Sequence, residues 1–442
     1  MGDLITVVGE YSILAFNTIT GSVLLYRLLR RDRVLQWIRH VSEAQVAVLG
    51  GGQLGRMLGH AGIPLGARCR FLDTHAECPA SAVGDVVHEG FEIGEHLDRF
   101  AEGVRVVTYE FENVPVEVAE YLAGRAEVRP PPRSLEVARD RMRERELFNR
   151  LGIATPRWAA VDSLDSIGEM LDGFPLPAIL KTRRMGYDGK GQARITSIDD
   201  ARGAWESIGG SPVSNEPRAR ARGAIEETPR ACARGSSEDR SGVVPAILDE
   251  MIPFRRELSI VAVRSIAGET MCYPPVENVH VNGILTRSVA PAPGVDDATR
   301  AEMERAARAI ADDLGHVGVL AVEFFETTDG RLLANEFAPR VHNTGHWTIE
   351  GARTSQFENH LRAILGMPLG STAMAAGGHA AMVNIIGDWP AREKLLAIPG
   401  LHLHDYDKTP KPGRKLGHVT IVEADTDSLL EKVRLIEEIV GA

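Results

Sequence analysis

Residues 318–340 read GVLAVEFFETTDGRLLANEFAPR, two largely apolar segments separated by a short polar stretch that contains Asp-Gly. This pattern predicts two antiparallel strands joined by a turn at residues 327–330. When the strands pair across that turn, we expect Glu323 to face Ala334. Glu336 then lies two residues further along, on the same face of the sheet as Glu323.

Two carboxylates on one face of a hairpin predict a divalent-cation site. At ~4 Å apart they would repel each other by about 4 kcal/mol at an effective dielectric constant near 20, and a cation between them converts that repulsion into coordination. Oxygen ligands suit Mg²⁺, which also takes oxygens from a substrate phosphate. We therefore expect Glu323 and Glu336 to bind Mg²⁺. The alternative is a solvated strand edge with two unrelated glutamates, which the flanking Ala, Leu and Phe residues argue against.

Donor-rich segments follow the hairpin and recur near the C-terminus. PRVHNTGHWT at residues 339–348 is typical of an anion or substrate site. HDYDKTPKPGRKLGH at residues 404–418 indicates a basic turn that grips a phosphate, or equally a solvated loop. The donors in the two segments are Arg340, His342, Asn343 and His346, and then Lys408, Arg414, Lys415 and His418.

A basic, glycine-rich loop, RRMGYDGKGQ, occupies residues 183–192 after a predicted strand that ends near Lys181. Its glycines let backbone N–H groups approach phosphate oxygens, and its basic side chains neutralise them. The loop lacks the G-x-x-x-x-G-K-[ST] spacing, which excludes a P-loop NTPase. The alternative is a flexible hairpin with solvated basic residues.

The stretch VAVLGGGQLGRM at residues 46–57 is a strand that leads into a G-x-G-x-x-G turn, and a second strand ends at Asp73. This pattern predicts a Rossmann-like domain and, taken alone, suits a dinucleotide-dependent dehydrogenase. Glycine is also favoured in any tight strand-to-helix turn, so the motif does not decide the function.

The α/β alternation begins at Gln45, and RPPPRS at residues 129–134 marks a boundary. Residues 207–242 have no hydrophobic period and predict a mobile surface insertion. Residues 380–442 predict a small β-rich domain with a terminal helix. Residues 1–44 contain an apolar stretch followed by basic residues, which we interpret as an extension rather than a secretory signal or a membrane anchor.

The composition, 44% hydrophobic and 25% charged, is that of a globular protein. The net charge of −11 excludes a general nucleic-acid-binding protein, which requires a basic face. Four scattered cysteines form no C-x-x-C pair, which predicts a reducing, cytoplasmic location and no structural zinc.

Four motifs together resemble the N5-carboxyaminoimidazole ribonucleotide synthases, ATP-grasp ligases of purine biosynthesis. They are GGGQLGRM, GYDGKGQ, NEFAPRVHNTGHWT and DKTPKPGRKLGH. The resemblance implies a Rossmann-like domain at residues 45–135, an ATP-grasp domain at 136–379 with its lid at about 178–255, and a C-terminal domain at 380–442.

The resemblance also implies a reaction. ATP and bicarbonate give carboxyphosphate, whose carboxyl group passes to the amine of 5-aminoimidazole ribonucleotide, releasing ADP and phosphate. It implies Mg²⁺ as the metal, a homodimer, and no dinucleotide in the first domain. Instead, the GGGQLG turn is expected to face the ribotide, with its amides near an anion.

Residue roles follow the same resemblance. Asp188 and Lys408 are expected to carry out carboxyl transfer. ATP is expected to contact Arg141, Lys181, Gly186, Tyr187, Asp188, Gly189, Lys190, Gly191, Gln192, Asp249, Glu250, Met251, Ile252, Glu257, His280, Asn335 and Glu336. Within that set, residues 249–252 would hold the adenine and Glu257 the ribose. The ribotide is expected to contact Gly52, Gln53, Leu54, Arg340, His342, Asn343, Lys408, Arg414 and Lys415.

Three alternatives stay open on the sequence alone. The nearest is another ATP-grasp ligase, such as the formate-dependent glycinamide ribonucleotide transformylase. The second is the dehydrogenase, and the third is a catalytically silent, membrane-tethered binding module.

Overall fold

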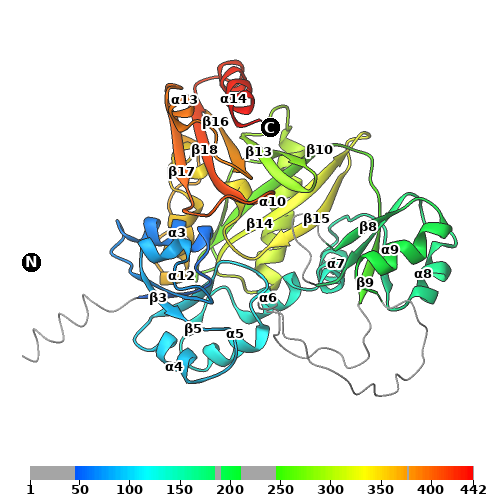
Figure 1. Ribbon diagram of the computed structural model, residues 1–442, viewed down its shortest axis with the longest axis horizontal. Helices are drawn as coiled ribbons and strands as arrows, with labels where there is room; N and C mark the ends of the chain where they lie inside the picture. The colour runs from blue at the N-terminus through cyan, green and yellow to red at the C-terminus, as the bar shows by residue number, and fades with distance from the viewer. Residues whose placement is uncertain (1–44, 185–190, 211–244, 376–377, 442) are drawn as a thin grey trace, which may run out of the picture. The chain divides into compact units, whose positions relative to one another are not determined.

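The computed structural model describes residues 45–184, 191–210, 245–375 and 378–441. Residues from Gln45 onward form one compact unit built on three sheets, shown in Figure 1. The predicted extension at residues 1–44 and nearly all of the predicted insertion lie outside the described residues. No helix in the described ranges is both long enough and apolar enough to cross a bilayer.

The first sheet is parallel and has the strand order β3-β2-β1-β4-β5. Its central strands β1 and β4 are buried along their whole length, because helices cover both faces of such a sheet. This arrangement confirms the Rossmann-like prediction. The strands are β1 Val46–Leu49, β2 Cys69–Asp73, β3 Asp85–His88, β4 Val106–Tyr109 and β5 Glu127–Val128, and the helices are α3 Gln53–Gly62, α4 Glu95–Ala101 and α5 Val116–Ala123, with η1 at Pro79–Ala82.

The second sheet has the order β6-β9-β7-β8, and we call it the lid sheet. Its core includes Leu180, Trp205 and Leu248, which two short helices cover. Its strands are β6 Trp158–Val161, β7 Ala178–Thr182, β8 Gln192–Ile195 and β9 Ala246–Glu250, and its helices are α8 Leu164–Leu171, η2 Ile198–Asp200 and α9 Ala201–Ser207. Two helices, α6 Pro132–Ala138 and α7 Arg141–Arg150, connect it to the first sheet.

The third sheet, the central sheet, follows the order β15-β14-β10-β12-β13-β16-β18-β17, with β11 beside β10. Strand β13 pairs with β16, so the strands after residue 378 continue the same sheet. The predicted boundary at residues 379/380 therefore falls within one continuous sheet. The strands are β10 Phe254–Arg264, β11 Thr270–Cys272, β12 Val276–Val281, β13 Ile284–Ala290, β14 Gly318–Thr327, β15 Leu332–Ala338, β16 His379–Ile386, β17 Leu401–Asp405 and β18 Lys415–Glu423.

Helix α12, Gln356–Leu365, joins the first sheet to the central sheet. Its apolar residues Phe357, Leu361 and Ile364 belong to one buried cluster with residues of β1 and β14. His360 of the same helix bonds to Thr108 of β4 at 2.9 Å. The remaining helices are α10 Asp297–Asp313, η3 Asn343–Gly345, α11 Thr348–Gly351, α13 Arg392–Leu396 and α14 Thr426–Val440.

Candidate active site

The 318–340 hairpin is present, but its predicted register is wrong. Phe324, rather than Glu323, pairs with Ala334, and a bulge follows, so that Glu323 lies directly opposite Glu336. Two one-residue offsets cause the difference: Glu326 pairs with Leu332 rather than with Arg331, and the bulge adds one extra residue, Asn335, on β15. The two carboxylates are therefore cross-strand neighbours, closer than the diagonal pair that the sequence predicted.

Electrostatic repulsion marks this pair. The Glu323 side chain is 15% exposed and the Glu336 side chain 42%. Burial raises the pKa of the Glu323 carboxyl to about 7, and the charge of Glu336 contributes to that rise. Arg141 partly balances Glu336, with Nη1 3.3 Å from Oε2. Two carboxylates held directly opposite each other on neighbouring strands can accept a cation between them.

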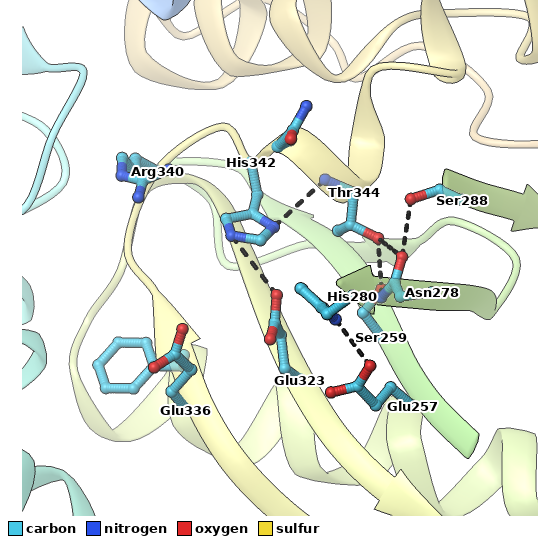
Figure 2. Close-up of polar contacts among 12 residues, drawn as sticks. Glu257, Ser259, Asn278, His280, Ser288, Glu323, Glu336, Arg340, His342 and Thr344 are labelled. Carbon is cyan, nitrogen blue, oxygen red and sulfur yellow. Dashed lines mark hydrogen bonds and ion pairs between the residues drawn. The ribbon is translucent and has the colours of Figure 1, made fainter. Parts of the chain in front are cut away.

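A third acidic residue, Glu257 of β10, lies on the same sheet face, as Figure 2 shows. Its Oε2 is 2.7 Å from Nδ1 of His280 on β12. Burial alone would lower the pKa of His280, but the hydrogen bond to Glu257 and the charge of Glu323 outweigh it and raise the pKa. The sequence placed both residues on the nucleotide, and the structure pairs them at the cleft.

A buried hydroxyl and amide network lies beside these residues on the same face of the sheet (Figure 2). Asn278 donates to Ser259 at 2.9 Å and accepts from Ser288 at 2.7 Å. Thr344 donates to Asn278 at 2.8 Å, and its hydroxyl is 2.6 Å from that of Ser259. The network ties three strands to the turn after β15 and so fixes that turn, because each of these side chains is held by its neighbours.

The turn after β15 presents His342, whose Nε2 is 3.6 Å from Oε1 of Glu323. Burial lowers the pKa of His342 well below its usual value, and the charges of Arg340 and Lys415 lower it further. The ring is therefore neutral. Its Nδ1 accepts from the Thr344 amide at 3.4 Å, which leaves Nε2 as the protonated nitrogen.

Arginine and lysine side chains at the end of β7 of the lid sheet also line the cleft that contains Glu323 and Glu336. Asp140, at the start of α7, accepts from Nη2 of Arg183 at 2.9 Å and from Nε of Arg184 at 3.1 Å. Lys181 donates to Asp249 at 2.8 Å. All three cations also line the cleft, whose volume is about 460 Å³. An anionic partner in the protein holds each of these side chains in place at the cleft. There they can bind the phosphates of a polyphosphate ligand.

Glu144 of α7 lies beside these groups and is 2% exposed. It accepts a hydrogen bond from the Phe337 amide at 2.7 Å. Burial raises its pKa to about 8, the charge of Arg145 opposes that rise and the charge of Glu336 adds to it. Glu144 is thus a neutral acid at pH 7.

We expect Glu144→Gln to gain stability relative to the wild type as pH rises. The native state keeps a proton that the unfolded state, with a pKa of 4.5, has lost. This contribution is complete below pH 4.5 and is lost as pH rises through about 8. Between pH 5 and 8, urea unfolding should show the free-energy difference shifting by at least about 1 kcal/mol in favour of the variant. Exposed Glu146→Gln on the same helix is the control and should show no such shift.

Arg340 points to the side of the cleft opposite the lid sheet. Its Nε donates to Glu112, and its Nη1 donates to the Val341 carbonyl at 2.9 Å. Burial would raise the pKa of Glu112, but Arg340 outweighs it and holds that pKa low. Asn343 is fixed by Asn384, which donates to it at 2.7 Å.

The basic C-terminal turn divides into two parts. Lys415 lines the cleft, whereas Arg414 is exposed and donates to the Thr409 carbonyl at 3.0 Å. Lys408 donates to the side chain of Gln53, which lines the cleft at the start of α3. Gln53 of the first domain and Lys408 of the C-terminal segment, both predicted to bind the ribotide, therefore lie in contact.

Three amides of the glycine turn before α3 donate to protein carboxylates. The amides of Gly52 and Gly55 donate to the two carboxylate oxygens of Glu110, and the Gly51 amide donates to Asp73 at 2.9 Å. Protein carboxylates therefore occupy the amides of Gly51, Gly52 and Gly55, whereas Gln53 and Leu54 of the same turn line the cleft, and their contact with the ribotide stays a prediction. The contacts with the protein carboxylates argue against a dinucleotide pyrophosphate at this turn and so against the dehydrogenase.

None of the four residues predicted to hold adenine, Asp249 to Ile252, lines the cleft. The Asp249 carboxylate is buried, and the Glu250 side chain accepts from the Arg157 amide at 3.3 Å. The Met251 amide already donates to the Pro177 carbonyl at 3.1 Å. Ile252 and the backbone carbonyls of the segment remain candidates for the adenine contact.

Most of the other predicted residues meet at one cleft. Those that line it are Gln53, Leu54, Arg141, Lys181, Gln192, Glu257, His280, Glu323, Asn335, Glu336, Arg340, His342, Asn343 and Lys415. Those that do not are Gly52, Gly191, Asp249, Glu250, Met251, Ile252, Lys408 and Arg414. The loop residues Gly186, Tyr187, Asp188, Gly189 and Lys190 lie outside the described residues.

Sequence reasoning missed several residues of this site. Glu110 and Glu112 directly follow β4, which pairs in parallel with β1. Because the carboxyl ends of adjacent parallel strands meet at one edge, that pairing could have placed both glutamates beside the glycine turn. Asp140 and Arg145 carried no such signal.

Three family models match successive parts of the chain. The ribonucleotide synthetase preATP-grasp domain matches residues 44–139, the ATP-grasp domain residues 146–357, and the phosphoribosylaminoimidazole carboxylase C-terminal domain residues 380–432. The order and extent of these matches confirm the predicted fold class.

Whole-chain relatives agree with these models. N5-carboxyaminoimidazole ribonucleotide synthase of Pseudomonas aeruginosa is 42% identical over 90% of this chain and 100% of its own length. The corresponding Brucella melitensis protein is 39% identical over 86% of this chain and 97% of its own.

Solved structures show the same likeness. N5-carboxyaminoimidazole ribonucleotide synthetase from Thermus thermophilus superposes with a TM-score of 0.78 at 45% identity, covering 90% of this chain and 99% of that one. The synthase from Aspergillus clavatus, in complex with ADP and 5-aminoimidazole ribonucleotide, gives 0.77 at 28% identity, covering 91% and 99%. The resemblance read from the sequence is confirmed, and the chain belongs to the N5-carboxyaminoimidazole ribonucleotide synthase family.

Proposed function

We propose that this chain carboxylates 5-aminoimidazole ribonucleotide with bicarbonate, using ATP, in purine biosynthesis. The observation that carries the proposal is one cleft that is lined by acidic residues of the hairpin and by basic residues of the lid sheet and of the C-terminal part of the chain. The carboxylates of Glu323 and Glu336 and the cations of the lid sheet meet there with Arg340 and Lys415. A relative of the same family supports it, since the Aspergillus clavatus enzyme was solved with ADP and 5-aminoimidazole ribonucleotide and also with ATP.

The residues at the hairpin fit Mg²⁺. Glu323 and Glu336 provide hard oxygen donors, and their mutual repulsion is what a divalent cation relieves. Among the described residues, no group of three or more His, Cys, Asp or Glu could enclose a metal. That fits an ion that takes its remaining oxygens from substrate phosphate. When bound, Mg²⁺ supplies charge neutralisation for the transferred phosphoryl group.

Phosphoryl transfer requires positioning and charge stabilisation rather than a covalent nucleophile. Lys181, Arg183 and Arg141 would hold the phosphates of ATP against the hairpin. Bicarbonate oxygen attacks the γ-phosphorus, the bond to the ADP oxygen breaks, and carboxyphosphate forms. Its lifetime depends on excluding water, a role that we assign to the lid sheet and the loop at residues 186–192.

Carboxyl transfer follows at the other side of the cleft. The ribotide amine attacks the carboxyl carbon, the bond to the phosphate oxygen breaks, and the amine loses a proton. We propose Asp188 and Lys408 for this step, with Gln53 holding the lysine. Arg340, His342, Asn343 and Lys415 would bind the ribotide, and Arg414 would have to turn inward to reach its phosphate.

The direct test measures ADP release from ATP, Mg²⁺ and bicarbonate, with and without 5-aminoimidazole ribonucleotide. We expect release that depends on the ribotide and on bicarbonate, together with formation of the carboxylated product. Release that the ribotide does not change would contradict the proposed substrate. Release supported by formate and glycinamide ribonucleotide would identify the transformylase instead.

We further propose that the chain acts as a homodimer in the cytoplasm. Cys69, Cys78 and Cys272 are free thiols, which suits a reducing compartment, and Cys232 lies outside the described residues. Light scattering of the purified protein should give twice the chain mass of 48.1 kDa. A mass of one chain would contradict the dimer.

A further inference from the structure

Asp249 belongs to a buried charge cluster behind the cleft. Its Oδ2 accepts from Nζ of Lys181 at 2.8 Å and from Nη2 of Arg145 at 3.1 Å. The Asp249 side chain is 3% exposed and that of Arg145 1%. Burial would raise the pKa of Asp249, but the two cations outweigh it and lower the pKa, so the carboxylate is charged.

The strand register places Asp249 diagonally beside Lys181 on one face of the lid sheet. On β9, Asp249 pairs with Ile179 of β7, which lies two residues before Lys181 and therefore on the same face. Lys181 lines the cleft and Asp249 does not. The carboxylate therefore takes one of the three ammonium donors, and no other described residue bonds to the remaining two, which a ligand can use.

Arg145 connects this pair to the central sheet. Its Nη1 donates to the carbonyl of Asn335, the residue before Glu336. Its side chain thus spans from β9 of the lid sheet to the strand that carries the proposed metal ligand. The position of Lys181 is tied by this contact to the position of the two carboxylates on the hairpin.

Asp249 does not line the cleft, which argues against direct contact between its side chain and adenine. The second carboxylate oxygen of Asp249, Oδ1, is buried and has no hydrogen-bond partner among the described residues. The same is true of Nε of Arg145. Lysine is flexible, and an anionic partner that already holds its side chain in one rotamer reduces the conformational entropy lost when the ligand binds.

We propose that Asp249 is a positioning residue that holds Lys181 for the phosphates of the nucleotide. Arg145 fixes the Asp249 carboxylate in the orientation that this requires. The inference rests on the proposed use of ATP. It assigns the side chain at the start of the 249–252 segment to the phosphate end of the nucleotide and leaves adenine to the backbone.

The test compares the affinities of the full chain for ADP and for adenosine, by calorimetry and without ribotide. For Asp249→Asn we expect ADP to bind about tenfold more weakly, the loss typical of one hydrogen bond between charged groups. Adenosine, which lacks phosphate, should bind as it does to the wild type. Asp249→Glu keeps the charge and should retain ADP affinity within about threefold.

Glu326→Gln is the matched control. It removes another buried ion pair, with Arg256, on a strand of the same site and outside the cleft lining. We expect it to change neither affinity. If Asp249→Asn does not fold, the double variant Arg145→Gln/Asp249→Asn removes both buried charges together and takes its place in the comparison.

Two results would overturn the inference. One is an unchanged ADP affinity in the asparagine variant. The other is an equal loss for ADP and adenosine, which would place Asp249 on the adenine or in the fold alone. A wild-type chain that binds no ADP would instead contradict the proposed function.

Discussion

Replacing Glu336 with alanine is expected to reduce ribotide-dependent ADP release by about 10²–10³-fold, the loss typical of removing one electrostatic group aimed at the transition state. Glu336 lies directly opposite Glu323, and we propose that the two share Mg²⁺. With one carboxylate gone, the remaining ligand cannot hold the cation in place. The steady-state assay should therefore also need a higher Mg²⁺ concentration to reach half of its maximal rate.

Glu326→Ala on the facing strand is the control for that experiment. Glu326 pairs with Leu332 on the same hairpin but lies outside the cleft lining. Its loss should lower stability and leave the Mg²⁺ dependence unchanged. A Glu336→Ala variant with wild-type turnover and wild-type Mg²⁺ dependence would contradict the proposed metal site.

Replacing Glu110 with glutamine is expected to lower the free energy of unfolding by about 2–4 kcal/mol. Each carboxylate oxygen of Glu110 accepts a different backbone amide, from Gly52 and from Gly55. A glutamine has only one oxygen at that position, so its NH₂ group must face one of these donors in a buried site. An unsatisfied buried donor costs about 1–3 kcal/mol, and the opposed donors add to that cost.

Urea unfolding measures this loss directly. Glu117→Gln on α5 changes an exposed carboxylate of the same domain and should alter stability by less than about 0.5 kcal/mol. If Glu110→Gln were as stable as the wild type, the contacts of Glu110 with the turn would not hold the start of α3.

The fold could largely be predicted from the sequence, because its signals are local. Apolar runs such as VAVL at residues 46–49 and the glycine turn after it fix a strand and a helix start without reference to distant residues. The join between β13 and β16 had no such signal. It depends on pairing between strands about 90 residues apart, which a local hydrophobic pattern does not encode.

The site was predictable in composition but not in detail. The hairpin residues Glu323 and Glu336 were found, yet their pairing was misplaced, because neither the register at the turn, where Glu326 pairs with Leu332, nor the bulge at Asn335 leaves a mark in an alternating pattern. The partners of the motif residues were missed for a related reason. Glu110 and Arg145 act on residues more than fifty positions away; the position of Glu110 at the end of β4 could have indicated its contact, but nothing near Arg145 in the sequence identifies its partners.

The continuity of the central sheet has a consequence for fragments of this chain. A chain cut before β16 would not lose an appended module, because β13 would become an edge strand with unpaired backbone groups along Ile284–Ala290. An exposed strand of this kind is a template for intermolecular pairing. Shortened forms of the protein would therefore be prone to aggregate, even though every proposed metal ligand remained in place.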